Sequence, residues 1–73
     1  MARPRAPFLD RQECLGFTHG AMRWRSADRK RLYEWDETHG HIEAYNQRGR
    51  HVGVLNGEGV VIGDARKGRR IDV

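Results

Sequence analysis

The fold of this chain is decided by one segment, residues 33–45, which reads Tyr-Glu-Trp-Asp-Glu-Thr-His-Gly-His-Ile-Glu-Ala-Tyr. Polar and apolar side chains alternate through much of it, as they do in a half-buried β-strand. Gly accepts a positive φ freely and His tolerates one better than most residues, so His39-Gly40 predicts a two-residue hairpin turn. In this hairpin Asp36 faces Glu43 across the two strands.

The predicted hairpin has one polar and one mostly apolar face, because side chains alternate along a strand. We expect Tyr33 and Trp35 to enter the core from the apolar face. His41 is expected to face solvent and to have no role. The polar face holds Glu34, Asp36, Thr38, His41, Glu43 and Tyr45, and the apolar face holds Tyr33, Trp35, Glu37, Ile42 and Ala44.

The position of His51 depends on the length of the next turn. A three-residue turn at residues 48–50 places Val52 and Val54 on the core side, beside Ile42 and Ala44, and leaves His51 on the same side as Glu43. A two-residue turn reverses these assignments.

The remainder of the chain extends this sheet and adds one short helix. Upstream of the hairpin, an extended arm at residues 3–7 precedes a helix over residues 11–15, which Asp10 is expected to cap and Gly16 to end. β-Favouring runs divided by Gly predict an antiparallel meander of strands at residues 31–37, 41–47, 51–55 and 60–62.

The predicted fold class is therefore α+β, mainly β, with a short N-terminal helix followed by a small, twisted antiparallel β-sheet. Residues 1–21 are expected to form the arm and helix, and residues 22–73 the sheet, within one compact domain. At 73 residues, 37% of them hydrophobic, the chain has a thin core, so we expect a site in an open groove.

Composition also excludes several classes of protein. The single Cys14 cannot form an internal disulfide and is expected to be a small apolar filler. No run approaches the length of a membrane span, and residues 1–7 lack the apolar core of a signal peptide. The Cys and His residues lack paired zinc-finger spacing, so neither a metal site nor a cofactor is expected.

Charge is distributed unevenly along the chain. Residues 32–45 carry four Asp/Glu and no Lys/Arg, whereas residues 1–31 carry eight Lys/Arg against three Asp/Glu. The pI near 10.0 favours a polyanionic partner. No segment has the long amphipathic face that insertion into a membrane surface requires, so nucleic acid is the favoured partner.

Cations and aromatic rings supply candidate RNA contacts. Trp24 and Tyr45 offer ring faces for base stacking, with core packing as the alternative for Trp24. His51 is expected to contact RNA or to be a simple surface residue. The cations that are expected to follow phosphates, or else only to solubilise the surface, are Arg23, Arg25, Arg29, Lys30 and Arg31.

Two carboxylates and an imidazole on one hairpin match the needs of RNA cleavage without metal. That reaction requires a base for the 2′-OH proton, an acid for the departing 5′-oxygen, and a cation for the extra charge on phosphorus. Glu43, His39 and an Arg suit these roles. The alternative is a solvated strand face, with His39 serving only as a turn residue.

The same residues carry a resemblance over roughly residues 22–56, with a weaker continuation to Ile71. The chain resembles the cytotoxic ribonuclease domain of the ribosome-inactivating colicins and cloacin. The motifs that carry the resemblance are Arg23-Trp24, Tyr33-Glu34-Trp35-Asp36, His39-Gly40, Glu43, Tyr45, Gly49, His51 and Gly53.

The resemblance implies a short helix on a strongly twisted sheet and a metal-independent cut in small-subunit ribosomal RNA. It implies that Glu43 is the base, His39 the acid and Asp36 the residue that orients or tunes the imidazole. The catalytic Arg of the family corresponds to Arg69, with Arg66 as the fallback and otherwise an RNA contact.

The resemblance also implies an acidic immunity protein as a partner and action in the bacterial cytoplasm, with delivery from outside as part of a larger toxin as one route. The alternatives are a non-catalytic module that binds RNA or the ribosome, and a toxin relic that binds an acidic immunity protein.

Overall fold

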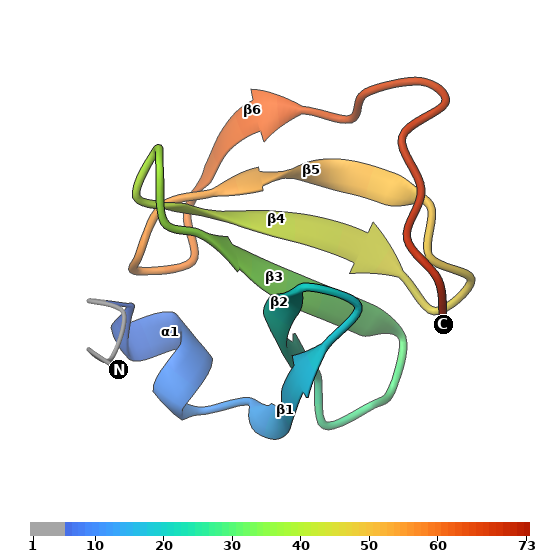
Figure 1. Cartoon of the computed structure of the whole chain (residues 1–73). Helices are drawn as coiled ribbons and strands as arrows, with labels where there is room; N and C mark the ends of the chain where they lie inside the picture. Colours follow the sequence, from blue (N-terminus) through green and yellow to red (C-terminus); the bar gives the residue numbers. More distant parts are fainter. Residues whose placement is uncertain (1–5) are drawn as a thin grey trace.

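A computed structural model describes residues 6–73 as one short helix and a six-stranded sheet (Figure 1). Strands adjacent in sequence are adjacent in the sheet, and every pair is antiparallel. The predicted fold class and meander are confirmed. The elements are α1 Pro7–Asp10, β1 Glu13–Thr18, β2 Ala21–Arg25, β3 Arg31–Asp36, β4 His41–Asn46, β5 His51–Leu55 and β6 Val61–Asp64.

The sheet curves around a small apolar core, with α1 lying beside the β5–β6 turn (Figure 1). Leu9 of α1 and Ile42 of β4 are 1% and 0% exposed. Burying a side chain of this size stabilises the fold by about 1.5–3 kcal/mol. Phe8 packs edge-on against Tyr33 with ring centroids 5.0 Å apart. The backbone N–H of Phe8 also donates to the Gly57 carbonyl at 3.1 Å, so α1 is joined to the sheet by both kinds of contact.

The predicted position of the helix is wrong. Asp10 ends α1 and does not cap a helix over residues 11–15, and Glu13–Thr18 forms strand β1 instead. Pro7 suits the first helical turn, and Leu9 fixes the helix by entering the core. Gly16 does adopt a positive φ, of 81°, but at a bulge in β1 and not at a helix end.

The N-terminal segment thus contributes a strand to the sheet, because β1 pairs with β2. Of the arm predicted at residues 3–7, residues 3–5 lie outside the described residues, and Pro7 begins α1. Among residues 6–73, no helix has the length and apolar character needed to cross a membrane.

The register of the first hairpin differs from the prediction by two residues. Asp36 pairs with His41, and Glu34 pairs with Glu43, across a turn of residues 37–40. The Asp36 carboxylate accepts the backbone N–H of His39 at 3.1 Å, and the Asp36 carbonyl accepts the N–H of Gly40 at 2.8 Å. These bonds favour the longer turn. A shift of two leaves each side chain on its predicted face.

The second hairpin confirms one prediction and corrects another. His51 lies on the same side as Glu43, as the longer turn predicted. Val52 and Val54 do not, however, flank Ile42, which pairs with Leu55. The reason is a bulge between the Ala44 and Tyr45 pairs, which leaves Val52 as the extra residue in β5 and turns Val54 toward Glu43.

Candidate active site

The C-terminal segment, residues 66–72, lies over the part of the polar face that holds Glu43, Tyr45 and His51, and these three residues are buried. This segment runs past the β4–β5 turn (Figure 1). The His51 N–H donates to the Arg69 carbonyl at 3.0 Å, and the Ile71 N–H donates to the Gly49 carbonyl at 2.8 Å. These backbone hydrogen bonds hold the C-terminal segment in place, and so they position its side chains over β4 and β5.

Glu43 lies at the centre of this face, with only 5% of its side chain exposed. One carboxylate oxygen, Oε1, is 3.1 Å from His51 Nε2 and 3.0 Å from Arg69 Nη1. The other, Oε2, is 2.9 Å from His41 Nε2. These two atoms are close enough for an ion pair, but the contact does not have the geometry of a hydrogen bond. Oε2 is therefore a buried oxygen with no hydrogen-bond partner. Glu43 therefore keeps one acceptor position toward the His41 side of the site.

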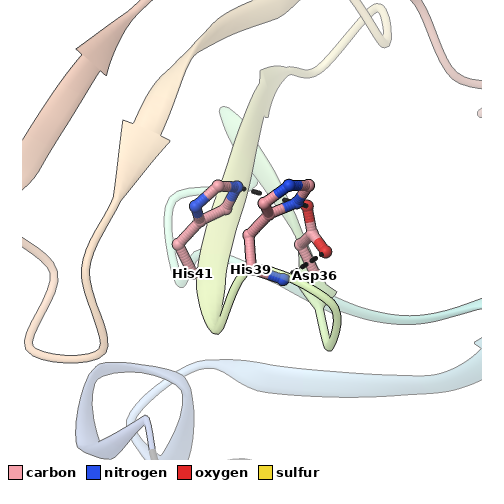
Figure 2. A group of neighbouring side chains, drawn as sticks. All are labelled: Asp36, His39 and His41. Carbon is pink, nitrogen blue, oxygen red and sulfur yellow. Dashed lines mark hydrogen bonds and ion pairs between the residues drawn. The ribbon is translucent and has the colours of Figure 1, made fainter.

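Asp36 links His39 to His41 (Figure 2). Its Oδ2 atom is 2.9 Å from His39 Nδ1 and 3.2 Å from His41 Nε2. The two imidazole rings are stacked, with centroids 5.3 Å apart and planes 9° from parallel. Burial raises the pKa of Asp36. The side-chain and backbone hydrogen bonds from His39 lower it and outweigh the effect of burial, so the pKa lies below its ordinary value. A carboxylate at Asp36 that stays charged favours an Nδ1–H tautomer at His39.

His39 is the most exposed member of this group, with 67% of its side chain accessible. Because Asp36 engages Nδ1, Nε2 is the ring nitrogen that remains for a bound molecule. His39 lies in the turn between β3 and β4, and its ring is held from one side by Asp36 and stacked on His41. The arrangement can present a proton at a fixed place on the surface.

Arg69 is the C-terminal cation that reaches Glu43. In addition to that ion pair, its Nε atom donates to the Tyr45 hydroxyl at 3.2 Å. Arg66 contributes a backbone N–H, which donates to His51 Nδ1 at 2.9 Å. Of the two predicted candidates, the structure brings Arg69 together with Asp36, His39 and Glu43.

A protein-family model described as Cytotoxic matches residues 10–72. The chain belongs to the Cytotoxic family. This match confirms the resemblance to the cytotoxic domain of colicins and cloacin, and membership indicates a toxin. A search of curated proteins returned no match.

Every predicted catalytic residue of this Cytotoxic domain lies within the matched segment. The match also includes β1 and the C-terminal segment through residue 72.

The predicted RNA-contacting side chains of the Cytotoxic domain are mostly buried. Trp24, Tyr45 and His51 are 7%, 1% and 2% exposed, so their rings are packed mainly against protein. Arg23 is 4% exposed and forms an ion pair with Glu34 at 3.0 Å. The contacts seen for these four side chains are structural, and their RNA contacts stay predictions.

The two remaining candidates, Arg25 and Arg66, lie nearer the surface. Arg25 pairs with Glu13 at 2.9 Å, and 29% of its side chain is exposed. Arg66 is exposed. Their predicted contacts with RNA are likewise untested.

An open groove of about 660 Å³ adjoins the site. Trp24 and Trp35 contribute to its apolar lining, and Asp36, Glu43 and Arg69 contribute charged groups. A groove that joins an apolar surface to ionisable side chains can seat a ring beside a charged group.

His41 is the residue that sequence reasoning missed. It was expected to face solvent without a role, but only 23% of its side chain is exposed, and its Nε2 lies between Asp36 and Glu43. The two-residue change in register placed it opposite Asp36. Its position two residues before Glu43 already put both side chains on one face, which was the available signal.

Replacing Gly49 with Ala is expected to detach the C-terminal segment from the β4–β5 turn. Gly49 has a φ of 83°, and a Cβ there would collide with the Ile71 carbonyl oxygen. We expect a loss of about 1–3 kcal/mol in the free energy of unfolding, together with faster hydrogen exchange at the Ile71 amide.

Gly68→Ala is the matched control, because Gly68 has a φ of 81° and nothing within 4 Å of the added Cβ. It isolates the cost of the backbone conformation from that of the collision. Equal exchange rates of the Ile71 amide in the two variants would contradict the claim that the Gly49–Ile71 contact holds the C-terminal segment in place.

Proposed function

We propose that this Cytotoxic domain is a metal-independent endoribonuclease toxin that cleaves small-subunit ribosomal RNA and thereby blocks translation. The observation that supports it best is the buried Glu43 carboxylate, in contact with Arg69 and His41 and next to the Asp36–His39 pair. A base, an acid and a cation thus lie in one site.

In the proposed reaction, Glu43 accepts the proton of a ribose 2′-OH, and the 2′-oxygen attacks the adjacent phosphorus. The bond from phosphorus to the 5′-oxygen breaks, and His39 gives this oxygen a proton from Nε2. Arg69 stabilises the additional negative charge on the phosphoryl oxygens. The products are a 2′,3′-cyclic phosphate and a free 5′-OH.

Asp36 is a positioning residue in this mechanism, because its carboxylate holds His39 Nδ1 and thereby aims Nε2 outward. His41 helps to hold the carboxylates of Asp36 and Glu43 in place, since it contacts both with a single nitrogen. Tyr45 and His51 hold Arg69 and Glu43 from the buried side.

Charge supports a polyanionic substrate. The chain has 14 Lys and Arg residues and a net charge of +4, and such an excess favours association with RNA. We further propose that the domain acts in the bacterial cytoplasm, arrives as part of a larger toxin, and is held inactive in its producer by an acidic immunity protein.

The test is incubation of intact ribosomes with the purified protein in a chelator. We expect one cut in small-subunit RNA, and a rate for His39→Ala that is lower by about 10²–10⁴-fold, the usual contribution of a positioned acid. His19→Ala is the matched control, since His19 is exposed and pairs loosely with Asp72 at 3.9 Å. Salt-sensitive binding without scission by the wild-type protein would instead support a non-catalytic RNA-binding module.

A further inference from the structure

The side chains of Asp36, His39 and His41 offer ligand atoms that all lie within 4.8 Å of one another (Figure 2). They come from the end of β3, the turn and the start of β4. Beside them, Glu43 Oε2 is buried, has no hydrogen-bond partner, and lies 2.9 Å from His41 Nε2. An unsatisfied buried carboxylate oxygen thus borders a ready group of two imidazoles and a second carboxylate.

We propose that this group is a binding site for a divalent transition-metal ion of the Zn²⁺ or Cu²⁺ class. Asp36, His39 Nδ1 and His41 Nε2 are the ligands. Glu43 Oε2, which lies 2.9 Å from His41 Nε2, borders the site and can join them only if the site rearranges. Imidazole and carboxylate ligands suit Zn²⁺ and Cu²⁺, whereas Mg²⁺ and Ca²⁺ prefer sets made of oxygen alone.

The ligand atoms are already close together, but metal binding requires the site to rearrange. The Asp36 Oδ2 atom is 2.9 Å from His39 Nδ1 and 3.2 Å from His41 Nε2. Ligands about 2.0–2.1 Å from Zn²⁺ at tetrahedral angles are separated by roughly 3.3–3.5 Å. The two Asp36 contacts must therefore lengthen by a few tenths of an ångström. The stacked imidazole rings must also turn so that both nitrogen lone pairs face the ion, and the turn that carries the exposed His39 can supply this movement.

The consequence for activity rests on the proposed function. An ion bound here engages His39, the proposed acid, and borders Glu43, the proposed base, and so competes with both proton transfers. The metal is therefore expected to inhibit RNA cleavage and not to support it. Sequence spacing did not predict such a site, because the ligands do not have zinc-finger spacing and meet only through the hairpin register.

Calorimetric titration of the purified protein with ZnCl₂ alone, without RNA, tests the site. We expect one ion per chain, an affinity that falls by about tenfold or more in both His41→Gln and His39→Gln, and no change in His19→Gln. Amide and imidazole NMR signals of His39 and His41 are expected to shift on addition of Zn²⁺ in the wild-type protein. His39 is exposed, so its variant separates ligand loss from misfolding.

Absence of Zn²⁺ binding by the wild-type protein, or an affinity equal to that of the wild-type protein in either ligand variant, would overturn the proposal. A loss of binding in His19→Gln would also overturn it, by placing the ion at His19 and Asp72. These outcomes do not depend on catalysis. If the wild-type protein binds Zn²⁺ but never cuts RNA, the proposed function fails and the metal site stands.

Discussion

Glu43→Gln is expected to lower the rate of ribosomal RNA cleavage by about 10²–10⁴-fold while leaving the fold intact. The amide has the shape of the carboxylate but cannot accept the 2′-OH proton. Its oxygen can still accept from His51 and Arg69, which now contact Glu43 Oε1 at 3.1 and 3.0 Å. Single-turnover cleavage of intact ribosomes measures the effect.

Glu37→Gln is the matched control for this change. Glu37 is an exposed residue of the β3–β4 turn and lines the same groove, so its substitution removes the same charge from the same region. We expect its cleavage rate to stay close to that of the wild-type protein. A Glu43→Gln rate within tenfold of wild type, in a variant with normal circular dichroism, would rule out Glu43 as the base.

Arg69→Gln is the second substitution with a large expected effect, a loss of about 10²–10³-fold in cleavage rate. Arg69 is the cation in contact with Glu43, and 42% of its side chain is exposed. It can therefore reach a phosphoryl group in the site without breaking the fold. Because it is partly exposed, its removal is expected to change the stability of the fold only slightly.

Arg66→Gln is the control that separates the loss of a positive charge from the loss of the particular position of Arg69. The substitution keeps the backbone N–H that donates to His51 Nδ1, and it removes the same charge three residues away from Arg69. We expect a much smaller loss in cleavage rate than for Arg69→Gln. A larger loss in Arg66→Gln would transfer the phosphate-stabilising role to Arg66.

The sheet was predictable because alternating side chains and well-spaced glycines describe short antiparallel strands. The position of the helix was not predictable. Asp10 resembles a helix N-cap and Gly16 a helix stop, but each has a different role in the fold. Asp10 closes α1, and Gly16 takes its positive φ at a bulge in β1. Pairing of β1 with β2 outweighed the local preference for helix.

The face of the hairpin that bears the site was predictable, but the pairing within it was not. Register depended on the Asp36 carboxylate, which accepts the His39 N–H and so stabilises a longer turn. Together with the bond from the Gly40 N–H to the Asp36 carbonyl, this bond favours the register in which His41, and not Glu43, lies opposite Asp36. The importance of His41 was missed for that reason.

The burial of Tyr45 and His51 depends on contacts that are distant in sequence. Arg69 donates to the Tyr45 hydroxyl, and the Arg66 N–H donates to His51. These bonds form only after the C-terminal segment has crossed the polar face. Local sequence patterns cannot predict contacts between residues so far apart in the chain. Only the family resemblance pointed to Arg69.

The central claim is that the cluster around Glu43 and His39 cuts RNA by using the neighbouring 2′-OH as the nucleophile. Its most direct test is analysis of the new RNA ends made by the wild-type protein in a chelator. The account predicts a 2′,3′-cyclic phosphate on the upstream fragment and a 5′-OH on the downstream fragment. A 5′-phosphate paired with a 3′-OH, or a cut that appears only after a metal is added, would contradict it.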